Sequence, residues 1–196
     1  LLGERAPVKA LRKLRDERDP DGFSRELWQE LAQLGWAGMA LPEHYGGSEF
    51  GFQGLGIAFE EAGRTLAATP LLSTVVLSGH LVFTLGNDVQ RERILPAVAS
   101  GDMLLALALE EGTKHHPTWV RTRAEPSEAG FTLNGQKTFV LDGHVADELL
   151  VVARSVGADD DPNGLGIYLV PTNTQGLTIE RTVMVDSRNA AKVVLS

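Results

Sequence analysis

The spacing of apolar residues changes near the middle of the chain. Up to about residue 100, apolar positions recur every three or four residues with polar residues between them, the pattern of amphipathic helices. We predict helices over 7–18, 24–34, 51–66, 70–86 and 87–100. Pro96 interrupts the last of these, so the prediction is five helices, or six if Pro96 splits one.

Local signals place the ends of these helices. Ser24 is a plausible N-cap and Gly35 a plausible stop for the second helix. Thr69 before Pro70 predicts a helix with proline at its first position, and Asn87 with Gln90 is a weak capping-box signal. In the helix over 51–66, one side is predicted to be apolar, and its members are Phe52, Leu55, Phe59, Ala62 and Leu66. Residues 36–47 are rich in glycine and predict a shaped loop.

The second half of the chain follows a period of two. Asn134-Gly135 predicts a type I′ hairpin turn after a strand over 131–133, and Lys137, Phe139 and Leu141 then alternate with polar or small neighbours. Apolar runs over 149–153 and 165–170 are typical of buried strands, and 177–179 and 192–195 predict two more. We therefore predict an α+β fold, with a helical domain over 1–102 and a small β-barrel or sandwich over 103–196. The stretch 101–116 joins the two, and we expect any cofactor site there.

Composition narrows the class of protein. The 196 residues are 43% hydrophobic and carry a net charge of −8, with scattered lysines and arginines, which argues against nucleic-acid binding. No apolar run reaches the length of a membrane span. Cysteine is absent, which excludes disulfides and thiolate chemistry and is compatible with a reducing cytoplasm. The chain lacks an initial Met and stops within a predicted strand, so we expect a longer natural chain.

Three patterns that can bind metal or donate protons have simpler interpretations. Residues 159–164 match the D-x-D-x-N-G start of a calcium loop, but the twelfth position is Val170 where a glutamate is needed, which favours a solvated turn. His115-His116 and the isolated His80 lack further ligands at metal spacing. Adjacent residues at a strand end face opposite sides, so at most one of Glu110 and Glu111 is expected to face a cleft. No metal site is predicted, and dinucleotide-binding, Walker and nucleophile-elbow motifs are missing.

Two longer patterns resemble the acyl-CoA dehydrogenase family. The first is Leu31-x-x-Leu34-Gly35-Trp36 leading into Leu41-Pro42-Glu43-x-Tyr45-Gly46-Gly47, and the second is Leu133-Asn134-Gly135-x-Lys137-x-Phe139-Val140 followed by Gly143 and Ala146-Asp147. The resemblance implies a helical N-terminal domain, a middle β domain and a C-terminal four-helix domain absent from this sequence. It further implies FAD, which takes a hydride from Cβ of an acyl-CoA thioester after a carboxylate base removes the Cα proton. In most members the C-terminal domain carries that base, so no catalytic residue is assigned here.

The resemblance also implies which residues face FAD. In place of the family's Thr-Glu-Pro, then Gly-Ser-Asp, this chain has Leu109, Glu110 and Glu111, then Lys114, His115 and His116. In place of Trp, then Ile or Val, then Thr or Ser, it has Phe139, Val140 and Leu141. Phe139 can stack and Lys114 can pair with a phosphate, but three hydroxyls are lost, each worth about 0.5–1.5 kcal/mol of binding.

Three functions stay open at this point. The chain can be part of a divergent FAD-dependent acyl-CoA dehydrogenase, which as a homotetramer would act on an acyl-CoA in fatty-acid or steroid side-chain breakdown. It can be the cofactor-poor subunit of an α2β2 heterotetramer, like the paired actinobacterial enzymes for steroid side-chain CoA thioesters. It can also be a non-catalytic module that binds a CoA ester or a partner protein. Flavin oxygenases on the same fold are a further possibility, and the acyl group itself is not specified.

Overall fold

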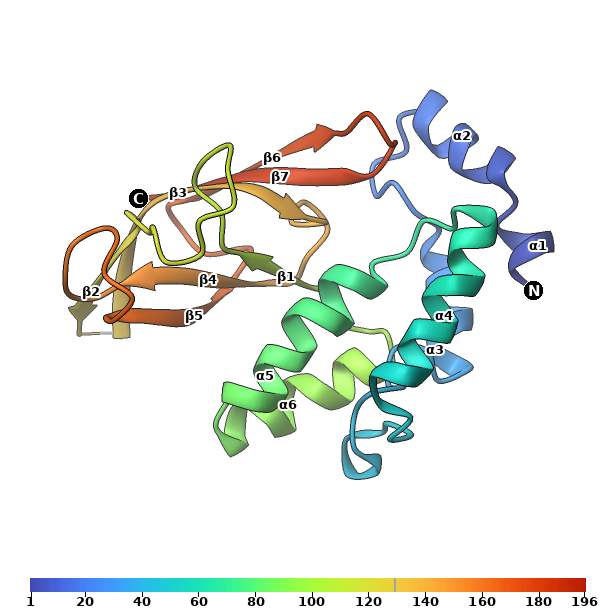
Figure 1. Cartoon of the computed structure of the whole chain (residues 1–196), viewed down its shortest axis with the longest axis horizontal. Helices are drawn as coiled ribbons and strands as arrows, with labels where there is room; N and C mark the ends of the chain where they lie inside the picture. Colours follow the sequence, from blue (N-terminus) through green and yellow to red (C-terminus); the bar gives the residue numbers. More distant parts are fainter. Residues whose placement is uncertain (129) are drawn as a thin grey trace. The chain divides into compact units, whose positions relative to one another are not determined.

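The chain forms two compact units (Figure 1). A computed structural model describes residues 1–128 and 130–196. One unit comprises Leu1–Leu104 with Val185–Arg188, and the other comprises Leu105–Met184 with Asn189–Ser196. The first is helical and the second contains the strands, which confirms the predicted change of period along the chain.

The helical unit contains α-helices of 4 to 15 residues together with a 3₁₀ turn and a π-helical stretch. Its elements are α1 (Leu2–Arg5), α2 (Val8–Asp16), α3 (Arg25–Gln33), the 3₁₀ turn η1 (Glu43–Tyr45), α4 (Gly51–Thr65), the π-helical stretch η2 (Leu71–Gly79), α5 (His80–Leu85) and α6 (Asp88–Ala99). Two predicted caps are confirmed. The Ser24 hydroxyl accepts from the Leu27 N–H at 3.2 Å, and Asn87 with Gln90 forms a complete capping box. Within the described residues, no helix is both long and apolar enough to cross a membrane.

Two details of the helix predictions were wrong, and the choice left open at Pro96 is settled in favour of a single helix. Pro70 is the N-cap of η2 instead of its first residue, and the first nine residues of that helix are wound as a π-helix. Helix α6 runs through Pro96, at the loss of the one backbone hydrogen bond that proline cannot donate. Phe52 and Leu66 are about half exposed, because the buried stripe of α4 consists of Leu55, Ala58 and Ala62.

The second unit is built on a seven-stranded sheet. Its strands are β1 (Leu105–Ala108), β2 (Arg123–Ser127), β3 (Gly130–Leu141), β4 (Glu148–Arg154), β5 (Leu165–Pro171), β6 (Leu177–Val183) and β7 (Asn189–Leu195). The order is β1-β4-β2-β3-β7-β6, with β5 paired to β4. Strand β4 pairs with β1 in parallel and with β5 antiparallel. All seven of its residues are buried, and because successive side chains point to opposite faces, both faces of this strand are covered. The four strands predicted over 149–195 are confirmed.

The predicted hairpin turn at Asn134-Gly135 was wrong. Both residues lie within β3, where Asn134 pairs with Arg123 of β2 and Gly135 pairs with Leu195 of β7, so the strand changes partner there. A side chain at Gly135 would come within 2.5 Å of the Thr122 hydroxyl oxygen. The glycine is therefore required by the close approach of Thr122 and not by a turn.

Candidate functional site

A β-bulge in β3 sets the geometry of the site. Lys137 pairs with Val193 and Val140 with Ala191, so Thr138 and Phe139 together oppose Lys192 alone. Phe139 has a φ of +55° and is 61% exposed, whereas Lys137 is fully buried. The extra residue turns the strand over, which breaks the simple alternation of Lys137, Phe139 and Leu141 that the sequence suggested.

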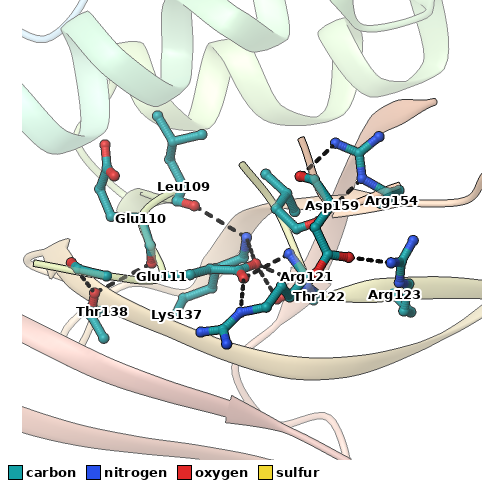
Figure 2. A network of polar contacts seen from close by, with 12 residues as sticks. Leu109, Glu110, Glu111, Arg121, Thr122, Arg123, Lys137, Thr138, Arg154 and Asp159 are labelled. Carbon is teal, nitrogen blue, oxygen red and sulfur yellow. Dashed lines mark hydrogen bonds and ion pairs between the residues drawn. The ribbon is translucent and has the colours of Figure 1, made fainter. Parts of the chain in front are cut away.

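The Lys137 ammonium and the Glu111 carboxylate form a buried ion pair (Figure 2). Lys137 Nζ donates to Glu111 Oε1 at 2.7 Å and to the Leu109 carbonyl oxygen at 3.1 Å. Glu111 also accepts from the Thr122 hydroxyl at 2.6 Å and from the backbone N–H groups of Arg121 at 2.8 Å and Thr122 at 2.9 Å. The Glu111 side chain is only 3% exposed. We call these residues, Glu111, Arg121, Thr122 and Lys137, the Glu111 clamp.

The clamp changes the acidity of both charged groups. Burial alone would raise the pKa of Glu111, but the hydrogen bonds from Lys137, Thr122 and the two backbone amides outweigh burial and hold it below its ordinary value. Burial lowers the pKa of Lys137, and the Glu111 charge offsets part of that effect. Because Glu111 stays ionised to lower pH than a free carboxyl, its charge is available to Lys137 throughout the neutral range.

Glu110 faces a different set of partners. Its carboxylate pairs with His115 Nδ1, and its backbone oxygen accepts from the Thr138 N–H at 2.7 Å. The Glu110 side chain is 20% exposed and that of His115 is 73% exposed. The two neighbouring carboxylates therefore have separate partners, the His115 ring near the surface for Glu110 and the buried Lys137 ammonium for Glu111.

The structure brings together some of the predicted cofactor residues and separates others. Leu109, Glu110 and Glu111 lie along the bulged part of β3, joined to it by the bonds to Lys137 and Thr138. Lys114, His115 and His116 belong to the exposed segment 112–119. Val140 is fully buried in the core of the sheet unit, so its side chain does not reach the surface, while Leu141 is partly buried. Among the predicted positions on β3, Phe139 has the exposed aromatic ring.

Several residues that organise the site were not predicted. No role was predicted for Thr122 or Arg121, and Lys137 was predicted only as a strand position and as part of a family pattern. A lysine inside an alternating strand and an arginine, Arg154, at the end of an apolar run were the available signals, because buried charges need partners. Arg154 is fully buried and ends β4, beside the turn over 155–164.

The D-x-D-x-N-G turn has internal partners for its acidic groups. The Asp159 carboxylate pairs with Arg123, and the Asp161 carboxylate accepts from the Asn163 N–H at 2.8 Å. Across residues 1–128 and 130–196, no three His, Asp or Glu side chains gather in a way that could hold a metal ion. Gly164, with a φ of +81°, closes the turn where a side chain would lie 2.3 Å from the Val156 oxygen.

Family models cover nearly the whole chain. The model for "Acyl-CoA dehydrogenase, N-terminal domain" matches residues 6–102, and that for "Acyl-CoA dehydrogenase, middle domain" matches residues 106–195. The chain is 33% identical over 159 residues to acyl-CoA dehydrogenase FadE12 of Mycobacterium tuberculosis, a match that covers 78% of this chain and 40% of that protein. It is 32% identical over 165 residues to benzylmalonyl-CoA dehydrogenase of Aromatoleum aromaticum, covering 82% and 42%.

Solved structures give the same result. A G363A variant of the Tcur3481-Tcur3483 steroid acyl-CoA dehydrogenase superposes with a TM-score of 0.87 at 32% identity, over 100% of this chain and 51% of that one. The ChsE4-ChsE5 complex of Mycobacterium tuberculosis superposes with a TM-score of 0.85 at 26% identity, over 100% and 50%. The chain thus spans about half the length, or somewhat less, of the proteins it matches.

Proposed function

Because this chain belongs to the acyl-CoA dehydrogenase family, we propose that it supplies the helical and middle domains of one subunit in an α2β2 acyl-CoA dehydrogenase whose partner subunit holds most of the FAD. The reaction of the assembly is α,β-dehydrogenation of an acyl-CoA thioester. The carboxylate base for the Cα proton comes from outside the residues described. The observation that carries this proposal is that the Glu111 carboxylate, at a predicted FAD position, is already hydrogen-bonded to Thr122 and Lys137 of the same chain.

The candidate positions offer only part of what FAD requires. A flavin ring needs a flat apolar surface together with hydrogen-bond donors at its polar edge, and its diphosphate needs cations or N–H groups. Phe139 offers the surface, since its ring is 61% exposed. Leu109 and Leu141 have no side-chain donor, and His115 is paired with Glu110. The Glu111 carboxylate is occupied by Lys137, Thr122 and two backbone amides, and a carboxylate cannot donate a hydrogen bond to the flavin. These residues do not make up a complete FAD site.

Internal satisfaction of the polar groups supports a subunit that folds without its own flavin. Every oxygen contact of the Glu111 clamp is to a group of the same unit, and the Lys137 charge is neutralised inside. An unfilled polar pocket would leave such groups unpaired, at a cost of about 1–3 kcal/mol each. The clamp avoids that cost without any ligand.

Two of the similar structures support the heteromeric arrangement by analogy. The names Tcur3481-Tcur3483 and ChsE4-ChsE5 each join two proteins, and the first is described as a steroid acyl-CoA dehydrogenase. We therefore take a CoA thioester of a steroid side chain as the first substrate class to test. The inference from those proteins to this one is an analogy of fold, since function resides in particular residues.

A second candidate is a self-sufficient FAD-dependent dehydrogenase, which as a homotetramer would hold one flavin in each subunit. The exposed ring of Phe139 on a strained bulge favours it, because a residue held at positive φ often presents its side chain to a ligand. Lys114, on the exposed segment 112–119, would then serve the FAD diphosphate.

The test is the visible absorption spectrum of the protein purified alone and after co-expression with a neighbouring dehydrogenase subunit. Each sample is also assayed for oxidation of acyl-CoA thioesters with an artificial electron acceptor. A flavin band and activity that appear only with the partner are the expected result. Flavin and activity in the protein alone would replace the proposal with the self-sufficient enzyme. Flavin in neither sample would overturn both and favour a binding module.

A further inference from the structure

Arg154 is a fully buried cation that bonds to backbone oxygens. It is the last residue of β4, and its guanidinium nitrogens have six carbonyl oxygens within 2.6–3.4 Å. Nε donates to Val120 at 3.1 Å, Nη1 to Val156 at 3.4 Å and Asn163 at 2.6 Å, and Nη2 to Thr118 at 2.9 Å, Asp159 at 3.2 Å and Asp161 at 2.7 Å. A charge removed from water needs compensation, and here carbonyl dipoles supply it.

The six carbonyls belong to two separate stretches of chain. Thr118 and Val120 lie on the segment that leads into β2, and the other four lie on the turn over 155–164. Figure 2 shows the Arg154 guanidinium beside Asp159 of that turn. Two carboxylates of that turn have other partners: Asp159 pairs with Arg123, and Asp161 accepts from the Asn163 N–H. The turn therefore behaves like a cation-binding loop in which backbone oxygens surround an attached guanidinium instead of a metal ion.

We propose that Arg154 is a positioning residue, a permanently attached cation that fixes segment 117–122 against the turn over 155–164 and so aims two amide N–H groups at Glu111. Two backbone hydrogen bonds also join segment 117–122 to β4 and to the turn over 155–164. The Arg154 N–H donates to the Thr122 oxygen at 2.8 Å, and the Val120 N–H donates to the Asp159 oxygen at 2.8 Å. The next N–H groups along the chain, those of Arg121 and Thr122, are the ones that bind the Glu111 carboxylate.

The shape of guanidinium explains why arginine occupies this position. Its five N–H donors lie in one plane and point outward in a fixed fork, so one group can bind oxygens on several sides. A lysine ammonium is a compact point charge with three donors and could not reach both chain segments at once. The inference concerns the shape of the segment and stands whether or not the proposed α2β2 assembly is correct.

The experiment removes the side chain and returns the cation from solution. In Arg154→Ala, the backbone amides of peptides covering 117–122 are expected to exchange hydrogen roughly tenfold faster or more, while peptides from β6 keep their protection. Free guanidinium at about 20 mM, far below denaturing concentrations, is expected to restore most of the lost protection. Sodium chloride and ammonium chloride at equal ionic strength are expected to have no such effect.

Arg123→Ala is the matched control, because it removes another guanidinium that contacts the same turn. Arg123 lies at the start of β2 and is partly exposed, and it pairs with Asp159 and donates to the Gly157 oxygen at 3.0 Å. In Arg123→Ala, the hydrogen-exchange rate of the amides in 117–122 should change by less than about threefold, and added guanidinium should not alter it. Equal loss of protection in β6 and 117–122, or no recovery with guanidinium in Arg154→Ala, would overturn the proposal.

A second variant decides the question if Arg154→Ala does not fold. Arg154→Lys keeps the charge and loses the fork, so it is expected to fold and to lose protection in 117–122 while β6 and β7 remain protected. Wild-type protection of 117–122 in Arg154→Lys would mean that a point charge suffices, and the assigned role of the fork would be wrong.

Discussion

Two fully buried cations in the sheet unit are compensated in different ways. Lys137 has a carboxylate partner, Glu111, at 2.7 Å and one carbonyl, whereas Arg154 has six carbonyl partners and a salt bridge to none of its acidic neighbours among the described residues. The compact ammonium is matched by one opposite charge, and the planar guanidinium is matched by dipoles on several sides. Loss of the Glu111 charge therefore leaves Lys137 without its one charged partner, whereas loss of any one carbonyl contact leaves Arg154 with five others on two chain segments.

The largest expected effect comes from breaking the charge pair. Glu111→Gln keeps the size of the side chain but leaves the Lys137 charge buried without its partner, so the free energy of unfolding should fall by about 3–5 kcal/mol. Chemical denaturation measures it. The exposed carboxylate of Glu125 on β2 provides the control, and Glu125→Gln should change stability by less than about 0.5 kcal/mol. Adding Lys137→Met to Glu111→Gln should recover part of the loss, and equal effects of the two Gln variants would refute the comparison.

Low pH should remove the stability that the Glu111 charge contributes. The pKa of Glu111 is lower in the folded than in the unfolded chain, so the folded state binds fewer protons as pH falls through that window. The stability advantage of the wild type over Glu111→Gln should be complete above the ordinary carboxyl pKa, about 4.3, and should be lost as pH falls through the lowered value. Denaturation curves of both proteins from neutral pH to acid measure the difference. An advantage that persists unchanged into strong acid would contradict the role given to the Glu111 charge.

A smaller effect tests how close β3 and Thr122 must be. Gly135→Ala places a methyl group within 2.5 Å of the Thr122 hydroxyl oxygen and 2.7 Å of its Cα, so the strand or Thr122 must move. The expected loss is about 1–3 kcal/mol. Gly130→Ala serves as a comparison, since it also has positive φ but nothing within 4 Å of the added carbon. A loss no greater at Gly135 than at Gly130 would show that contact with Thr122 is not the constraint.

The smallest effect on stability is expected at the exposed part of the bulge. Phe139→Ala removes a ring that is 61% exposed and should change the free energy of unfolding by less than about 1 kcal/mol. Phe139→Gly should be about 1 kcal/mol more stable than Phe139→Ala, because glycine adopts positive φ without strain. Thermal unfolding of the pair measures the difference. A loss comparable to that of Glu111→Gln would mean that the ring is packed and not presented to a ligand.

The sequence predicted the architecture because apolar spacing and capping residues act locally. Ser24 and the pair Asn87 and Gln90 cap their helices with their own side chains, and the apolar run over 149–153 is sufficient to specify a buried strand. The bulge could not be predicted in this way. It depends on the register between β3 and β7, which are separated by about fifty residues of chain, and it decides that Lys137 is buried and Phe139 exposed.

The sequence predicted which residues belong to the site but not the hydrogen bonds and ion pair between them. The resemblance to a family placed Leu109 to Glu111 and Phe139 to Leu141 in one site, and the structure does join these stretches through Lys137 and Thr138. It could not supply the partners of Glu111, because Thr122 and Lys137 reach it across the sheet. Two adjacent glutamates, Glu110 and Glu111, are expected at the surface, because charged residues are rarely buried without a partner. The buried Lys137 that pairs with Glu111 is known only from the structure.

The most direct test of the central claim is the affinity of the protein, purified alone, for FAD, measured by titration and flavin fluorescence. The comparison is with a triple variant, Leu109→Thr, His115→Ser and Leu141→Thr, which restores three hydroxyls. The wild type should bind weakly, and the triple variant should bind about tenfold to a thousandfold more tightly, since each hydrogen bond adds about 0.5–1.5 kcal/mol. A wild-type protein that retains FAD through purification, or a triple variant that binds no more tightly, would contradict the account.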